Sequence, residues 1–394
     1  MTINSPATTY RQNILLVFSV IFGLLLFMFA IDFLTYSLAR LNNEVANNIF
    51  MATYNPFVGL FIGLLMTALI QSSSTVSAMV VAVVASGQIS LSQAVPLIMG
   101  ANIGTTLTST LVAFGYIMKT KEFRKALSAG VLHDFFNIIT VVILLPLEVY
   151  FDVLSHTAQF LTHTFFMDQS RFDRDYTYHG FFLRPLSIYL SALLHQVFLA
   201  LAAGILMLIA SIKILSSLAY KTLITPNFKK VSKHIFKVPL RSFTYGLFFT
   251  AAVQSSTITT SLMVTAVATG RIALKRVFPF IMGANIGTTI TAAIAALYKT
   301  EAAISVAVVH LLFNTIGALI FLPFPSVRRI PVKLASMFGK QTVKTRFVGF
   351  AYILLTFFVI PFFLIYFNKS DHPKHTDHPP YSASKEVVVE EKKK

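Results

Sequence analysis

The sequence predicts an all-α polytopic membrane protein with two inverted-topology repeats, whose re-entrant or broken helices meet in the middle of the membrane. The first observation is composition: 55% of the 394 residues are hydrophobic and 12% are charged. Soluble domains carry about 25% charged residues. The second observation is a pair of polar motifs that occurs twice at one spacing. The third is that the charges flanking the two copies are reversed, which is typical of inverted repeats.

The repeated motifs lie in apolar sequence, where unpaired polar groups are costly. A Gln-Ser-Ser stretch occupies residues 71–75 and recurs at 254–257. A Gly-Ala-Asn-Ile-Gly-Thr-Thr stretch follows at 100–106 and recurs at 283–289. Positions 71 and 254, like positions 100 and 283, are 183 residues apart, so the chain contains an internal repeat. The motif glycines predict an unwound turn or a close helix approach rather than a nucleotide-binding loop.

The elements follow from apolar runs and their lengths. The run 14–38 is too long for a signal-peptide core and predicts the first spanning helix. The runs 57–70 and 76–85 are each too short to cross about 30 Å of lipid, so the polar break between them predicts a re-entrant hairpin or broken helix. The predicted organisation is 1–56, N-terminal tail, first spanning helix and loop; 57–147, repeat one; 148–243, central loop, linking span and basic cytoplasmic linker; 244–324, repeat two; 325–367, basic loop and last span; 368–394, disordered polar tail.

The loop charges orient the repeats. Loop 88–93 of repeat one has no charge, whereas its counterpart 271–276 is basic. The next loops show the opposite bias, because 119–125 is basic and 299–301 carries one Lys and one Glu. Under the positive-inside rule equivalent loops then lie on opposite sides, with 119–125, 271–276 and the N-terminus in the cytoplasm. The loop charges do not decide the side of the C-terminal tail, for which the periplasm is one option. The net charge of +17 sits largely in such loops, so no nucleic-acid partner is predicted.

The Gln-Ser-Ser stretches predict an anion site. A half-helix that starts inside the bilayer points free N–H groups and its positive dipole end at a neighbour. Hydroxyls and amides add neutral donors, and neither stretch contains Arg or Lys. The predicted anion ligands are Gln71, Ser72, Ser73, Ser74, Gln254, Ser255, Ser256 and Thr257. The alternative is that these small residues only let helices pack closely, and their duplication favours the site.

The Asn-Ile-Gly-Thr-Thr segments supply hard oxygen ligands, which suit Na⁺ better than a transition metal. The candidates are Asn102, Thr105, Thr108, Asn285, Thr288 and Thr291. The chain has no cysteine, which excludes disulfides and thiolate metal sites. No cofactor is predicted.

Asp134 is the one carboxylate deep in a repeat span, and Leu311 takes its place in repeat two. A charged residue at such a place is a functional candidate by default. The alternative is a structural carboxylate bonded to His133 or Asn137. His133 and His310 are candidate proton carriers, although hydrogen bonding to broken backbone is the favoured interpretation.

Together these motifs, with His-Asp-Phe-Phe-Asn at 133–137, resemble the type II sodium-dependent phosphate cotransporter family over roughly residues 14–367. The resemblance implies Na⁺-driven import of inorganic phosphate by alternating access, in a lipid bilayer and with Na⁺ as coupling ion. It implies phosphate at the Gln-Ser-Ser stretches and Na⁺ near the Asn-Ile-Gly segments and Asn137. It also implies an electrogenic transporter with Asp134 at a Na⁺ site, because electroneutral members carry Gly there.

The chain departs from animal members of that family in two ways. Lys119 stands where they often have an acidic residue, so one proposed Na⁺ ligand is missing or replaced. The central loop is short, which is typical of a bacterial member and predicts the bacterial inner membrane as its location.

Three other functions are weighed. A carrier of another oxyanion, or one coupled to H⁺ through His133 and Asp134, stays open. An uncoupled anion pore is disfavoured because rings of charged residues are not visible. A serine hydrolase using Ser73 or Ser256 is disfavoured because neither serine lies in Gly-x-Ser-x-Gly. The oligomeric state is not predicted.

Overall fold

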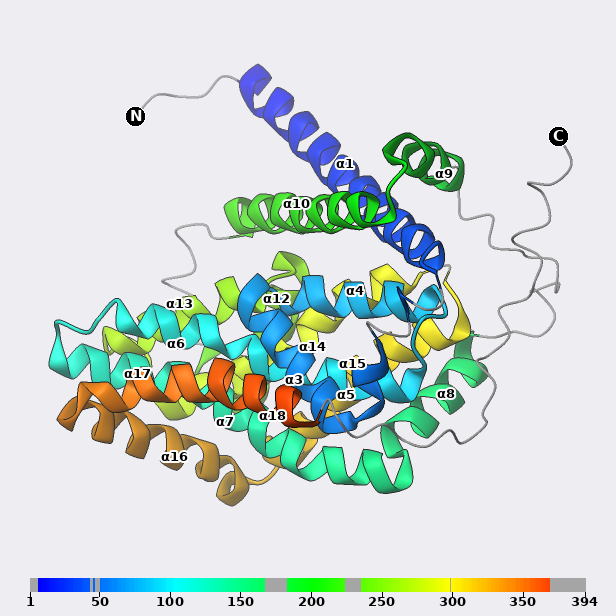
Figure 1. Ribbon diagram of the computed structural model, residues 1–394. Coiled ribbons are helices and arrows are strands. Elements are labelled where there is room, and N and C mark those ends of the chain that lie inside the picture. The colour runs from blue at the N-terminus through cyan, green and yellow to red at the C-terminus, as the bar shows by residue number, and fades with distance from the viewer. Residues whose placement is uncertain are drawn as a thin grey trace, which may run out of the picture.

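The computed structural model describes residues 6–42, 45–46, 50–166, 183–223, 235–297 and 299–368. Within these ranges all regular secondary structure is helical, which confirms the all-α prediction (Figure 1). The helices are α1 (Pro6–Ala39), η1 (Met51–Tyr54), α3 (Pro56–Ile70), α4 (Ser73–Ala85), α5 (Leu91–Gly104), α6 (Thr106–Phe114), α7 (Thr120–Phe151), α8 (Val153–Phe166), α9 (Leu183–Leu194), α10 (Val197–Leu223), α12 (Pro239–Val253), α13 (Ser256–Ala268), α14 (Leu274–Ala296), α15 (Glu301–Phe321), α16 (Pro325–Lys344), α17 (Arg346–Leu354), the π-helix η2 (Leu355–Val359) and α18 (Ile360–Asn368). The predictions for the basic linker at 224–234 and the polar tail from 369 lie outside the described residues.

Seven helical segments within the described ranges are long and apolar enough to cross a membrane. They are Leu15–Ala39, Leu91–Phe114, Thr120–Phe151, Val197–Tyr220, Leu274–Ala296, Glu301–Phe321 and Arg346–Phe367. The apolar helices α3, α4, α9 and α13 are shorter. The chain is therefore a multi-pass membrane protein. In Figure 1, α1 and α10 pack on each other along one side of the other helices.

The first two helices of each repeat have the same limits once the repeat spacing is applied. Helices α3 and α12 are both 15 residues long, and α4 and α13 are both 13. Both first helices open on a proline, Pro56 and Pro239, whose fixed φ suits the first helical turn. Helix α12 therefore begins five residues before the boundary predicted at 244.

Each repeat packs its first helix closely on the helix that carries the second motif. A methyl group added to Gly100 would collide with the backbone of Leu60 on α3, and one added to Gly283 with that of Phe243 on α12. Each of these glycines has another four residues later, the small-residue spacing that lets membrane helices approach. The motif glycines therefore serve close helix approach and not an unwound turn.

The predicted central loop is partly wrong, because α7 continues to Phe151 and α8 follows after one residue. The break lies at Asp152, which has a positive φ of 48°. Buried Glu148 then accepts hydrogen bonds from the N–H groups of Leu154 and Ser155, at 2.7 and 3.2 Å, and so caps α8. The single linking span is also wrong, since it divides into α9 and α10 at His195, where φ is 54°.

The predicted basic loop before the last span is instead helix α16. Its buried residues are Pro331, Ala335, Gly339 and Thr342, which share one face at helical spacing. Gly339 lies directly against Ser128 and the Arg124 carbonyl of α7. The lysines of α16 are exposed, and their number predicted a loop although one narrow face of the helix is buried.

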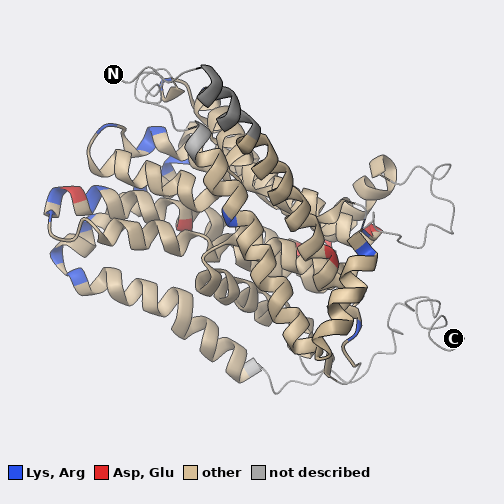
Figure 2. Ribbon diagram, turned by 90° about the horizontal axis from the view of Figure 1, so that it is seen from above, with Lys and Arg blue, Asp and Glu red and all other residues tan. Residues whose placement is uncertain are grey.

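The ends of the helices group into two sets of loops. At one end the turn after α13 meets the start of α7, since Lys125 Nζ lies 3.2 Å from where a Cβ of Gly270 would stand. At the other, Gln88 Nε2 donates to the Leu38 carbonyl of α1 at 3.2 Å, and Lys299 Nζ lies 3.3 Å from Asp32 Oδ1, also on α1. Figure 2 shows most Lys and Arg gathered at the first end. Non-equivalent loops of the two repeats therefore share each end.

Candidate functional site

Both Gln-Ser-Ser stretches are helix breaks with the same backbone geometry. Gln71 ends α3 in the left-handed region (φ 57°, ψ 30°), and Gln254 ends α12 likewise (φ 54°, ψ 26°). Non-glycine residues in that region are uncommon and cluster at functional sites. The next residues cap the following helices: Ser72 Oγ accepts from the Thr75 N–H at 3.2 Å, and Ser255 Oγ accepts from the Ile258 N–H at 3.3 Å.

The two breaks face each other. Ser74 Oγ donates to the Gln254 carbonyl at 3.3 Å, and Thr257 Oγ1 donates to the Gln71 carbonyl at 3.5 Å. Positions 74 and 257 are equivalent in the repeat, as are 71 and 254, so the two contacts are reciprocal. Such reciprocity is what a two-fold relation between the repeats produces.

The predicted anion ligands differ in exposure. Ser73, Ser74 and Ser256 are buried, with 3–4% of their surface exposed. Gln71 is exposed, while Ser72, Gln254, Ser255 and Thr257 are half-buried. The first turns of α4 and α13 therefore lie inside the protein, and one of the two glutamines lies at the surface beside them. Free N–H groups at these helix starts and the buried hydroxyls form a neutral set of donors.

Three of the predicted Na⁺ ligands meet in one buried amide cluster. Asn137 Nδ2 donates to the Asn102 carbonyl at 2.6 Å, and Asn137 Oδ1 accepts from Asn285 Nδ2 at 2.8 Å. Two further residues join it: Asn314 Nδ2 lies 3.2 Å from Asn102 Oδ1, and His133 Nε2 lies 2.6 Å from Asn285 Oδ1. Asn314 was not a predicted ligand, although its place as the counterpart of Asn137 could have indicated it.

The cluster joins the repeats with incomplete symmetry. His310, the counterpart of His133, is buried and neither of its ring nitrogens has a partner within the described residues. The described residues also contain no group of three or more His, Asp or Glu that could hold a metal ion. Candidate cation ligands here are therefore amide, hydroxyl and backbone oxygens.

The predicted threonines divide between two environments. Thr105 and Thr288 each donate to the carbonyl four residues earlier in their own helix, at 2.9 Å. Thr291 Oγ1 instead lies 3.5 Å from Ser74 Oγ and so links the second motif to the first helix break. Thr108 is half-buried on α6 and makes no side-chain hydrogen bond within the described residues.

Asp134 lies apart from the amide cluster. Its Oδ2 accepts from the Tyr352 hydroxyl at 2.8 Å and from Thr110 Oγ1 at 3.4 Å, while Oδ1 has no partner among the described residues. The bonds to His133 or Asn137 considered from the sequence are not made. Tyr352 lies on α17, and no sequence signal connected the last span with this carboxylate.

Comparison with known proteins relates the chain to one family. A family profile described as Na+/Pi-cotransporter matches residues 26–145 and 206–360. Sodium-dependent phosphate transport protein 2A of Ovis aries is 30% identical over 419 residues, covering 86% of this chain and 65% of that protein. Sodium-dependent phosphate transport protein 2B of Homo sapiens is 27% identical over 437 residues, covering 85% and 62%. The chain thus spans less than two thirds of the length of these relatives. No solved structure matches it.

Proposed function

The chain belongs to the Na+/Pi-cotransporter family, and we propose that it is a Na⁺-coupled symporter that imports inorganic phosphate. The observation that carries the proposal is the pair of helix breaks facing each other, with Ser74 donating to Gln254 and Thr257 to Gln71. Relatives of this chain are named sodium-dependent phosphate transport proteins. Hydrogen-bond donors of this kind match an oxyanion such as phosphate.

Phosphate binds between the starts of α4 and α13 in this proposal. The N–H groups at the two helix starts favour an anion through the helix dipole. Buried Ser73 and Ser256 add hydroxyl donors. Since the Gln-Ser-Ser stretches contain no Arg or Lys, bound cations supply the compensating charge.

Na⁺ binds at the amide and hydroxyl oxygens of the second motif. Asn102, Asn137 and Asn285 already lie within one hydrogen-bonded cluster. Thr291, within reach of Ser74, is the residue through which a cation site adjoins the anion site. Asp134 adds a separate buried carboxylate with one unpartnered oxygen, which accommodates a further Na⁺ and makes transport electrogenic.

Alternating access follows from two inverted repeats that rock about this site. The reciprocal contacts across the two breaks, and the sharing of each end by non-equivalent loops, support inversion. We assign the basic end to the cytoplasm under the positive-inside rule, and a cytoplasmic N-terminus follows from that assignment. The short region between the repeats supports the bacterial inner membrane as the location.

Uptake of radiolabelled phosphate into proteoliposomes tests the proposal. An inward Na⁺ gradient should drive accumulation, and replacing Na⁺ with choline should abolish it. Excess unlabelled sulfate should not compete, and a pH gradient alone should not drive uptake. Uptake that follows the pH gradient without Na⁺, or labelled sulfate carried as well as phosphate, would instead support the alternative carriers.

A further inference from the structure

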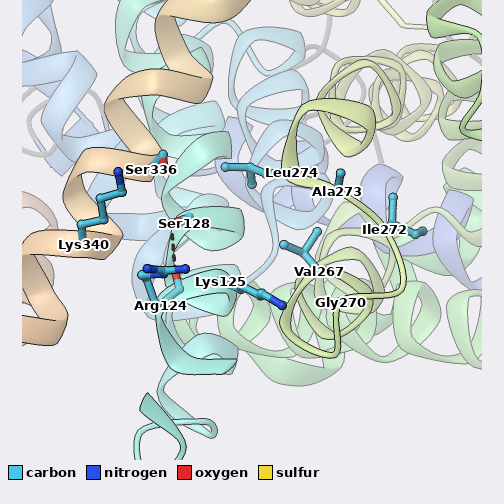
Figure 3. A pocket seen from close by; sticks show the side chains of 10 residues that line it. All are labelled: Arg124, Lys125, Ser128, Val267, Gly270, Ile272, Ala273, Leu274, Ser336 and Lys340. Carbon is cyan, nitrogen blue, oxygen red and sulfur yellow. Dashed lines mark hydrogen bonds between the residues drawn. The ribbon is translucent and has the colours of Figure 1, made fainter. Parts of the chain in front are cut away.

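A pocket at the basic end lies away from the helix breaks (Figure 3). It is an open pocket of ≈ 370 Å³ between the start of α7, the turn that joins α13 to α14, and the last turns of α16. Its polar lining is Arg124, Lys125, Ser128, Ser336 and Lys340. The turn from 267 to 274 supplies an apolar wall opposite.

The polar lining carries an unbalanced positive charge. The three basic side chains come from two helices, and the lining contains no carboxylate. Within the described part of the chain, none of the three forms an ion pair. Ser336 makes no hydrogen bond there either, whereas Ser128 Oγ donates to the Arg124 carbonyl at 2.8 Å. The three basic side chains are exposed residues that line one pocket without a carboxylate, and such a lining favours an anion there.

Close packing holds these groups in place. Gly339 lies against Ser128 and the Arg124 carbonyl, which fixes the end of α16 on the start of α7, and Lys340 follows it in the chain. Lys125 Nζ lies 3.2 Å from where a Cβ of Gly270 would stand, and the φ of +72° at Gly270 is a conformation that favours glycine. The arrangement is therefore built by helix packing and a turn.

The charge is a property of this end and not of the repeated fold. The counterpart of Gly270 is Gly87, with a φ of +77°, and a Cβ there would meet nothing within 4 Å. In the register that pairs His133 with His310, the counterpart of Arg124 is Glu301. The two repeats thus build similar turns, but only one turn faces a cluster of cations.

We propose that this pocket binds a phosphate group, on an anionic lipid headgroup or as free inorganic phosphate. A guanidinium can donate to two phosphate oxygens at once, and ammonium and hydroxyl groups can donate to the same oxygens or to further ones. The apolar wall adds a surface for a lipid's glycerol and first methylenes. Basic pockets between membrane helices on the cytoplasmic side commonly hold such headgroups.

Site-directed labelling tests the proposal, because the chain has no cysteine of its own. Ala273→Cys places a thiol in the lining, and Met118→Cys, at an exposed position before α7, is the control thiol. The rate of maleimide labelling is measured in nanodiscs of phosphatidylcholine, with and without inorganic phosphate, and in nanodiscs containing phosphatidylglycerol. Each labelling measurement is repeated in a protein that also carries Arg124→Gln plus Lys340→Gln. It is repeated again with the matched pair Lys121→Gln plus Lys344→Gln on the same helices.

We expect a phosphate group to slow labelling at Ala273→Cys about tenfold and to leave Met118→Cys unchanged. Protection by inorganic phosphate in phosphatidylcholine identifies the free anion, and protection by phosphatidylglycerol alone identifies the lipid. Arg124→Gln plus Lys340→Gln should abolish the protection, and the matched pair Lys121→Gln plus Lys344→Gln should keep the protection. No protection by either probe, equal protection of both thiols, or equal loss in both pairs overturns the proposal. Phosphate bound at the helix breaks could also change labelling by moving the repeats, but such an effect would survive the pocket pair of substitutions, so the two pairs separate it from binding in the pocket.

Discussion

The charge of Asp134 offers the sharpest test of coupling, because two substitutions separate its charge from its hydrogen bond. Asp134→Asn removes the charge and keeps an oxygen that can accept from the Tyr352 hydroxyl, which now lies 2.8 Å from Oδ2. Tyr352→Phe removes that hydroxyl and keeps the carboxylate. Asp134 is fully buried, so solvent does not replace the lost charge.

The magnitude follows from the charge moved. A divalent phosphate with two Na⁺ carries no net charge, and a third Na⁺ adds one. One charge crossing 100 mV gains about 2.3 kcal/mol, which limits the acceleration to about 50-fold. The potential should accelerate uptake by the wild type measurably, up to that limit, and Tyr352→Phe should keep this acceleration. Asp134→Asn should lose the acceleration, and its Na⁺ Hill coefficient should fall by about one.

Phosphate uptake into proteoliposomes, with a valinomycin-imposed potassium potential, measures the effect. Uptake by Asp134→Asn must be present but insensitive to the potential, since loss of all uptake would only show that the side chain is needed. If wild-type uptake ignores the potential, the carboxylate serves to anchor α17 on α7 and transport is electroneutral. If Asp134→Asn keeps its voltage dependence, the charge is carried elsewhere.

Three further predictions concern the anion site, the topology and one buried ion pair. Ser73→Ala or Ser256→Ala should weaken phosphate affinity by about 1–3 kcal/mol in uptake kinetics, with normal membrane insertion; wild-type affinity in both would remove them from the site. Single cysteines at Gln88 and Arg271 should react with impermeant reagents from opposite sides of the membrane, and labelling from one side would contradict inversion. Burial lowers the pKa of Lys299 to about 8 despite the opposing Asp32 carboxylate, so the native state binds fewer protons than the unfolded state from about pH 8 to 10.5 and gains stability there as pH rises. The stability difference between wild type and Lys299→Met should therefore change across that window in thermal unfolding, and a constant difference would refute the shift.

The sequence by itself identified the elements whose signal is local. Apolar runs located the spans, and polar residues within them located both helix breaks, because a polar group in lipid is expensive wherever the chain places it. The repeat spacing carried over to structure so closely that α3 and α12, and α4 and α13, have equivalent limits. The basic residues before the last span predicted a loop, but this segment is helix α16, which buries only one narrow row of side chains.

Only the tertiary structure decided which of these residues meet. Asn102 pairs with Asn314, and Asn137 with Asn285, across more than a hundred residues, and nothing in a linear motif specifies its partner. Asp134 contacts Tyr352 of α17 rather than its own neighbours in α7. His133, one position away, lies on another side of the helix, and the amide of Asn137 is bonded to Asn102 and Asn285. The basic pocket likewise exists only because Gly339 lets α16 lie against α7. The sequence thus predicted which residue types the site contains, whereas the contacts between them depend on the packing of helices from both halves of the chain.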